Sequence, residues 1–226
     1  MKKLLILIIC LSLTVVLSAS TPIALTLKVK HDVVLRRTED KIDLETGKEL
    51  ISKDVLESGE DSYAAVKFVD GSSVVKLFPN SILKISADKK GDKLDKNNYL
   101  ELGNLWSKVM KKTGTFEVET PTTVVSVKGT EFLLQVEETG LTNVFTVSGE
   151  VMMRNKKDDA EVTVKSGENG TNDGENPMQV HKTEEEKLDD ETNKIIEEES
   201  AEEAEVLEIE LKNDEGEMRR VKIIFK

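Results

Sequence analysis

The sequence predicts an all-β fold, a twisted sandwich, roll or solenoid, followed by a C-terminal acidic helix and a β-hairpin. Three observations lead to this prediction. Between residues 21 and 165, apolar residues alternate at period two, and Gly, Asn or Asp interrupts them about every ten residues. No stretch in this range keeps a helical period over three turns. Charge also shifts along the chain: residues 21–180 hold 22 basic and 27 acidic residues (net −5), whereas residues 181–226 hold 8 and 17 (net −9).

Residues 1–20 have the pattern of a secretory signal peptide. Lys2 and Lys3 precede an apolar run over residues 4–17, and small residues follow up to Ser20. The run is 14 residues long, whereas a helix that stays in the membrane needs about 20. We therefore expect cleavage after Ser20 and an exported protein, in the periplasm or on the cell surface; an uncleaved anchor is the alternative.

The single cysteine, Cys10, lies inside the apolar run. Branched Ile8 and Ile9 precede it, where a lipoprotein signal would need small residues. We expect it to be removed with the leader, which leaves a cysteine-free exported chain whose core is large enough to do without disulfides.

The β region is expected over residues 21–165. Asp70-Gly71 ends one alternating run and supplies the positive φ angles of a tight hairpin, so residues 72–78 should return as the partner strand. The polar stretch 88–98 is expected to be a loop. The expected strands cover residues 23–29, 33–35, 64–68, 72–78, 82–85, 105–109, 116–118, 124–127, 132–136, 144–147, 151–153 and 162–164.

A linker, a helix and a hairpin are expected after this region. Residues 166–182 are rich in Gly, Asn and Asp and poor in apolar groups, which is typical of a linker. Thr183 and Glu186 match a capping box at the start of an acidic helix that extends to about residue 205. Its thin apolar stripe consists of Leu188, Thr192, Ile195 and Ile196.

Two alternating runs close the segment 183–226. Residues 207–211 and 221–225 alternate on either side of a polar turn, which predicts a terminal hairpin. An isolated hairpin is marginally stable in water, so we expect it to dock on the β region, on the helix or on a partner.

The composition argues against several classes of protein. A formal net charge of −12 has the wrong sign for a surface that binds nucleic-acid phosphates. His31, His181 and Cys10 lie far apart in sequence and predict no zinc or thiol site. Only one apolar run approaches the length of a membrane span, which argues against a multi-pass membrane protein. We therefore predict no catalytic, cofactor-binding or metal-binding residues, no cofactor, and membrane contact only through the signal segment.

Several residues could suggest a site, and each has a structural alternative. Asp70-Gly71 could hold a metal, but a hairpin turn in which Asp70 caps its own backbone is favoured. Gly129-Thr130 lacks the spacing of a phosphate loop, so a bulge or tight corner is favoured there, as it is at Gly103, Gly149 and Gly167.

Three further features leave alternatives open. His31 and His181 have no matching partner in sequence and are expected to be solvated. Trp106 alternates with Leu105, so it is either a partly exposed binding anchor or part of a second core layer. The acidic run 197–199 is expected to be a solvated face, although it could bind calcium diffusely or meet a basic partner.

Five groups of motifs resemble FecR domains in their order along the chain. They cover about residues 50–170. The groups are residues 65–72 (AVKFVDGS) with Pro79-Asn80-Ser81 behind it, 102–106 (LGNLW) with 116–121 (FEVETP), 127–132 (VKGTEF), 146–151 (TVSGEV) and 164–168 (VKSGE).

The resemblance implies an exported, twisted, solenoid-like β module. In the regulators that name the family, this module lies in the periplasm and relays signals between an outer-membrane receptor and a cytoplasmic sigma factor. Those regulators hold the sigma factor with a cytoplasmic segment ahead of their membrane helix. Here only residues 1–3 precede the apolar run, so we expect this chain to lack the anti-sigma segment.

From these observations we predict a non-enzymatic scaffold or binding module of the bacterial cell envelope, whose partner is an envelope protein or a glycan. Two alternatives come from other classes. The first is a component of transmembrane signalling related to FecR-type sigma-factor regulation. The second is an envelope glycan hydrolase, which would need two carboxylates across a cleft, one with a raised pKa; no pair in the sequence is marked for that role.

Overall fold

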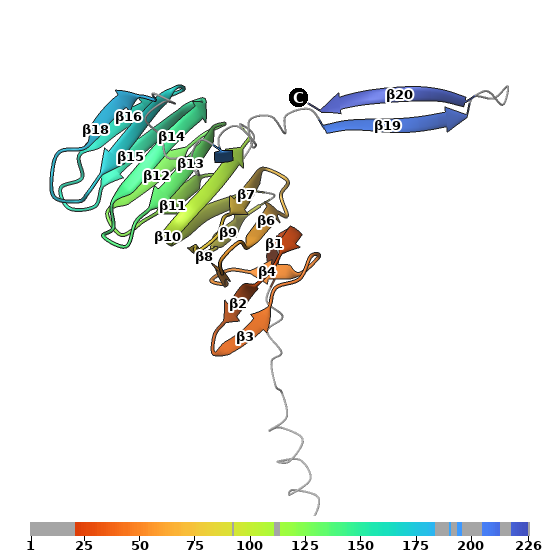
Figure 1. The fold of residues 1–226 in the computed structure, drawn as a ribbon, viewed down its shortest axis with the longest axis horizontal. Helices are drawn as coiled ribbons and strands as arrows, with labels where there is room; N and C mark the ends of the chain where they lie inside the picture. The colour runs from red at the N-terminus through yellow and green to blue at the C-terminus, as the bar shows by residue number, and fades with distance from the viewer. Residues whose placement is uncertain are drawn as a thin grey trace, which may run out of the picture.

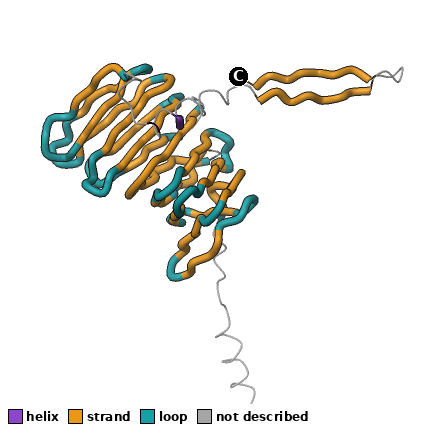
Figure 2. Tube along the Cα trace, viewed as in Figure 1, coloured by secondary structure: helices purple, strands orange, loops and turns teal. Residues whose placement is uncertain are grey.

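The computed structural model describes residues 21–91, 93–110, 114–183, 190, 194–195, 205–212 and 218–225. Within these ranges the chain is nearly all β, which confirms the predicted fold class (Figure 2). The strands form two curled layers, here called sheet A and sheet B, and follow one another along the long axis of the molecule (Figure 1).

Sheet A is the layer that contains Trp106. Its strands pair antiparallel in the order β4 (Glu49–Ile51), β1 (Pro22–Lys30), β6 (Tyr63–Phe68), β7 (Ser73–Leu77), β10 (Lys93–Val109), β13 (Glu131–Val136), β14 (Thr142–Ser148), β17 (Glu168–Asn172) and β18 (Gln179–Lys182).

Sheet B forms the second layer. Its order is β3 (Asp40–Asp43), β2 (Val33–Arg37), β5 (Val55–Ser58), β8 (Ile82–Lys84) with β9 (Ala87–Lys90), the first half of β10, β11 (Phe116–Glu119), β12 (Thr123–Val127), β15 (Glu150–Asn155) and β16 (Glu161–Lys165). Strands β10 and β11 run parallel, whereas the other pairings within the sheet are antiparallel.

Strand β10 joins the two layers. Its first part pairs with β8 and β9 in sheet B, and from Gly103 onward it pairs with β7 and β13 in sheet A. Gly103 has φ +90°, and a Cβ there would lie 2.7 Å from the Cα atom of Ser81. Glycine is therefore required at the corner where the chain crosses between the sheets.

The main core lies between the sheets and comes from the alternation seen in the sequence. Inward residues of both layers are fully or almost fully buried, including Val66 and Leu134 of sheet A and Leu83 and Val118 of sheet B. Each such side chain contributes about 1.5–3 kcal/mol to stability through burial.

The prediction of a loop over residues 88–98 is wrong, because this stretch forms β9 and the start of β10. Leu94, Lys96 and Asn98 are the buried positions of this stretch of β10. Two of these three side chains are polar, so the strand lacks the apolar alternation that reveals other strands. Their buried polar groups are hydrogen-bonded, which makes burial possible.

The prediction of a linker over residues 166–182 is also wrong, because β17 and β18 extend sheet A there. Gly170 packs so closely that a Cβ would lie 2.5 Å from the sulfur of Met153. Asn172 is buried, and its amide donates to Thr123 Oγ1 at 2.9 Å and to the Thr122 carbonyl at 3.2 Å. Strand pairing and side-chain hydrogen bonds thus order a stretch that has few apolar groups.

The terminal hairpin is confirmed. Strands β19 (Glu205–Lys212) and β20 (Met218–Phe225) pair antiparallel along their whole length. Asp190, Lys194 and Ile195 are helical, whereas the rest of the expected helix over 183–205 and the signal segment 1–20 lie outside the described residues. Among the described residues, no helix has the length and hydropathy of a membrane span.

Candidate functional site

The Asp70-Gly71 turn is confirmed as a structural feature. Gly71 has φ +68°, and the backbone N–H of Ser72 donates to Asp70 Oδ1 at 3.1 Å. The turn joins β6 to β7, which pair antiparallel as the predicted hairpin requires. Its aspartate therefore caps its own backbone, as the residue types indicate.

Asp70 also forms a buried ion pair, which sequence reasoning missed. Lys96 Nζ donates to Asp70 Oδ2 at 2.7 Å, to Ser72 Oγ at 2.7 Å and to the Leu94 carbonyl at 3.0 Å. The Lys96 side chain is fully buried, and its Nζ atom lies 5.4 Å from the centre of the Phe68 ring. With all three donors satisfied, this lysine ties the β6–β7 turn to β10 and has no donor left for a ligand.

The pKa of Asp70 results from opposing effects. Burial by itself raises it, but the hydrogen bonds from Lys96 and Ser72 outweigh the burial and lower the pKa below its ordinary value. The carboxylate is therefore ionised at neutral pH, as an ion pair requires.

The glycine positions are tight corners, as predicted. Gly129 and Gly149 have φ values of +70° and +84°, and Thr130 Oγ1 between their strands donates to the Glu150 carbonyl at 2.9 Å. A Cβ at Gly149 would lie 2.7 Å from the Gly129 carbonyl oxygen. Close backbone approach therefore explains this glycine pair.

His31 and His181 are both exposed, as predicted. No group of three or more His, Cys, Asp or Glu side chains within the described ranges is arranged to hold a metal ion. Trp106 belongs to a second core layer, since it is 2% exposed and packs with Leu133 and Phe145 on the outer face of sheet A. That finding decides between the two readings that the sequence left open.

The outer face of sheet B carries a row of cross-strand neighbours in which two valines accompany two basic residues, one acidic residue and one tyrosine. Cross-strand register places six residues side by side on six neighbouring strands. They are Val55, Lys84, Tyr99, Glu119, Val124 and Arg154. This row, here called the Tyr99 row, needed the tertiary structure to be seen, because its members are spread over 100 residues of sequence.

Tyr99 lies between two lysines. The Lys84 Nζ is 5.3 Å and the Lys156 Nζ is 5.8 Å from the centre of its ring, within the range of a cation–π contact. Lys156 also donates to Glu119 Oε2 at 3.0 Å and to the Thr120 carbonyl at 3.1 Å. Tyr99 itself is half-buried, so the ring has both a supported position and an accessible part.

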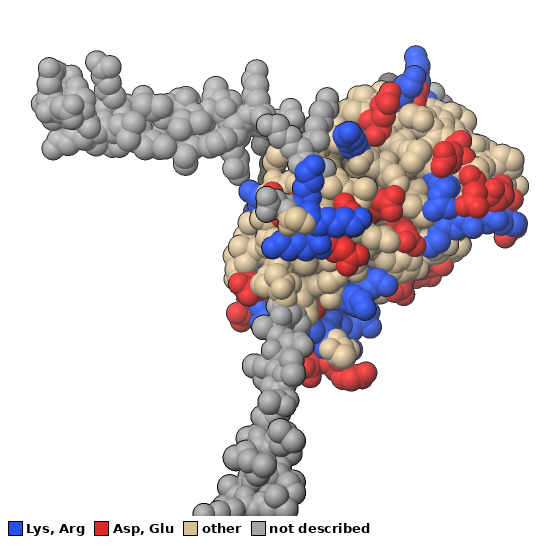
Figure 3. Space-filling model, turned by 180° about the vertical axis from the view of Figure 1, so that it is seen from behind, with Lys and Arg blue, Asp and Glu red and all other residues tan. Residues whose placement is uncertain are grey.

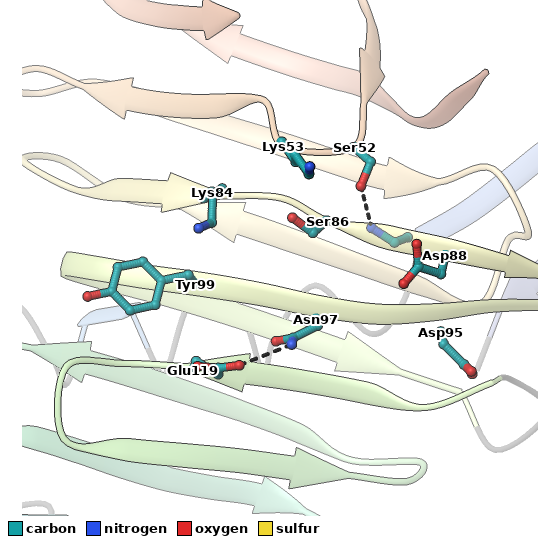
Figure 4. A pocket seen from close by; sticks show the side chains of 10 residues that line it. Ser52, Lys53, Lys84, Ser86, Asp88, Asp95, Asn97, Tyr99 and Glu119 are labelled. Atoms are coloured by element: carbon teal, nitrogen blue, oxygen red, sulfur yellow. Dashed lines mark hydrogen bonds between the residues drawn. The ribbon is translucent and has the colours of Figure 1, made fainter. Parts of the chain in front are cut away.

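A pocket of about 250 Å³ adjoins this tyrosine (Figure 4). Asn97 and Glu119 form one wall and are joined by a hydrogen bond of 3.0 Å. Ten residues from four neighbouring segments line it: Ser52, Lys53, Lys84, Ser86, Ala87, Asp88, Asp95, Asn97, Tyr99 and Glu119. The lining is polar, with both charge signs and an aromatic ring, which suits hydrogen bonding and stacking with a ligand.

The carboxyls around the pocket act as hydrogen-bond acceptors. The hydrogen bond from Asn97 and the charge of Lys156 lower the pKa of Glu119 despite partial burial. The hydrogen bond from Lys90, together with the Thr115 backbone N–H, lowers the pKa of Asp95 to about 2. Both groups are ionised at neutral pH, whereas a glycosidase acid needs a raised pKa.

The molecule is thus a two-layer β-protein in which the outer face of sheet A carries a covered aromatic cluster and the outer face of sheet B carries an accessible polar pocket. Figure 3 shows basic and acidic side chains in mixed groups over one face of the molecule.

A family comparison identifies the class further. The FecR protein family matches residues 54–168, about half of the chain. The chain therefore belongs to the FecR family, which confirms the resemblance seen in the sequence motifs. A comparison with curated proteins found no match.

Two solved structures are similar to the chain, each of a "putative anti-sigma factor" from Parabacteroides distasonis ATCC 8503. The structure at 1.65 Å resolution has 16% sequence identity and a TM-score of 0.51 over 70% of this chain. The structure at 2.50 Å has 17% identity and a TM-score of 0.49 over 57% of this chain. The chain spans 68% and 60% of the length of those proteins, respectively. At these identities the likeness concerns the fold alone.

Proposed function

We propose that this protein is a non-catalytic FecR-domain module of the cell envelope that binds a protein partner through the Tyr99 row. The observation that carries the proposal is Tyr99 itself, half-buried between Lys84 and Lys156 at the edge of a polar pocket. Tyrosine is a common anchor near the centre of protein interfaces. The signal pattern of residues 1–20 supports export as part of the same proposal.

The charges of the row suggest the chemistry of the partner. Lys84 is exposed beside the ring and has the positive charge to receive a carboxylate. Asn97 and Glu119 add a donor and an acceptor at the far side of the pocket. A partner segment with an acidic side chain next to an apolar or aromatic one would match this arrangement.

Site-specific photocrosslinking in intact cells tests the proposal. A photoreactive amino acid replaces Tyr99 in one variant and Tyr63, the other tyrosine of the chain, in the control. Tyr63 lies in sheet A and packs edge-on against Phe78, so it reports on the opposite layer. We expect a discrete protein adduct at position 99 that Lys84→Glu abolishes and that position 63 does not give. Equal crosslinking at both positions, or adducts unaffected by Lys84→Glu, would contradict the proposal.

FecR-type signalling is a second candidate function, and membership in the FecR family favours it. In that case the bound partner would be a component of a relay across the envelope. Deleting the gene and measuring genome-wide transcripts tests this role. A small set of promoters that respond to the deletion, and whose activity the Lys84→Glu variant fails to restore, would support signalling through the same face. Unchanged transcripts would contradict signalling and leave partner binding as the proposed function.

A further inference from the structure

The outer face of sheet A carries a row of apolar and aromatic side chains in cross-strand register. Trp106 lies opposite Lys76 on one side and opposite Leu133 on the other, and Leu133 lies opposite Phe145. Leu105, the neighbour of Trp106, points into the main core instead. We call Trp106, Leu133 and Phe145 the Trp106 row.

This outward row is covered. Trp106, Leu133 and Phe145 are 2%, 0% and 6% exposed, although they face away from the main core. Ile195 is 4% exposed and belongs to the same cluster, with Phe78 and Val147 packed against it. Ile195 is one of the four residues of the predicted apolar stripe in the acidic segment, and it is the residue of that stripe that the structure places against the outer face of sheet A.

The chain between the end of β18 and Ile195 is long enough to reach the Trp106 row. Strand β18 ends at Lys182, and it lies four strand positions from β10 in sheet A. Four positions correspond to about 19 Å. The twelve steps from Thr183 to Ile195 span about 18 Å if the predicted helix crosses the strands. An apolar stripe at helical spacing would then face the sheet.

The charges on the two partners are complementary. On the strands from β4 to β13, this face of sheet A presents more basic than acidic residues. The lysines are Lys28, Lys30, Lys67, Lys76 and Lys108, and the carboxylates are Glu49 and Glu131. The segment 181–205 holds 3 basic and 12 acidic residues, a net charge of −9. Opposite charges of this kind favour a defined docking orientation.

We propose that the outer face of sheet A is a docking surface for an acidic amphipathic segment, and that residues 183–205 of the same chain occupy it in cis with Ile195 as the anchor. The acidic segment then covers an aromatic row that would otherwise be exposed. This surface is separate from the Tyr99 row on sheet B, so the inference does not depend on the proposed function.

The single tryptophan provides the readout. Trp106 is the only tryptophan in the chain. Its emission wavelength and its quenching by neutral acrylamide therefore report whether the Trp106 row is covered. In the full-length mature chain, Ile195→Asp should shift the emission to the red and increase the quenching. Ile195→Ala should shift the docking equilibrium by roughly tenfold or more, since most of a buried side chain is lost. Ile195→Leu should keep the wild-type emission.

Asp190→Ala is the matched control, because Asp190 is helical and exposed in the same segment. It should leave the emission unchanged, and far-UV circular dichroism of every variant should show the wild-type β signal. If Ile195→Asp keeps wild-type emission and quenching while it remains folded, the proposal is wrong. If the emission of the wild type depends on protein concentration, the segment docks on a second copy and the cis arrangement is wrong.

A peptide covering residues 183–205 tests the charge contribution. Added to the full-length Ile195→Asp variant at about 1 mM, near the effective concentration of a short tether, it should restore the blue-shifted emission. Raising the salt to 1 M should weaken this rescue, because the Debye length falls to about 3 Å. Rescue by a peptide with the same composition in scrambled order would contradict an anchored docking mode.

Discussion

Replacing Asp70 with alanine should destabilise the folded state by about 3–5 kcal/mol, because it leaves the Lys96 ammonium buried without its counter-charge. The magnitude follows from the surroundings of Lys96. Its side chain is 0% exposed, and Asp70 supplies the only charged acceptor among the three groups to which it donates. The same substitution removes the cap on the Ser72 backbone N–H. Such a loss is a large part of a typical stability of 5–15 kcal/mol.

Equilibrium unfolding in urea, followed by far-UV circular dichroism, measures this effect. The double variant Asp70→Ala/Lys96→Met should be more stable than Asp70→Ala alone, because it removes the unpaired charge as well. Glu175→Ala is the matched control: its ion pair with Lys157 is exposed, so its loss should cost about 0–1 kcal/mol. A cost below about 1 kcal/mol for Asp70→Ala, or a double variant as unstable as the single one, would refute the buried-charge argument.

The same ion pair predicts a dependence on pH. The folded-state pKa of Asp70 is below its unfolded value because the hydrogen bonds from Lys96 and Ser72 outweigh burial. Its contribution to stability is therefore fully present above about pH 4, the ordinary aspartate pKa, and is lost as the pH falls through the folded-state pKa. In Asp70→Asn this part of the acid sensitivity should disappear, whereas unchanged acid unfolding would contradict the assignment.

Two further predictions concern the corner of β10 and a surface turn. Gly103→Ala should cost roughly 2–5 kcal/mol in a thermal unfolding assay, since it combines a strained positive φ with a backbone clash. Gly47→Ala has the strain without the clash and should cost about 1–2 kcal/mol; equal costs would be inconsistent with the close approach. In a carboxyl NMR titration, Asp173 should titrate at about 2, because the Asn176 side chain and nearby backbone N–H groups donate to it. Asn176→Ala should raise this pKa while that of Asp95 stays at about 2, and an unmoved Asp173 would argue against the assigned cause.

Local sequence determined the hairpins of this protein. Alternation from Ala64 to Phe68, followed by Asp70-Gly71, was sufficient to predict β6, its turn and β7, because turn chemistry and period two act over a few residues. The terminal hairpin 205–225 followed from the same two signals. The FecR motifs extended these local patterns to a family, and the family match over residues 54–168 agrees with them.

Tertiary structure alone decided which polar groups are buried. Lys96 and Asn172 look like loop residues in the sequence, yet each is buried on a strand because partners more than 20 residues away satisfy its hydrogen bonds. The same non-local pairing assembled the Tyr99 row from six strands and placed Ile195 over Trp106. Short-range patterns carry turn geometry and alternation, but the partner that makes a buried charge or an outward tryptophan stable is set by strand register across the whole sheet.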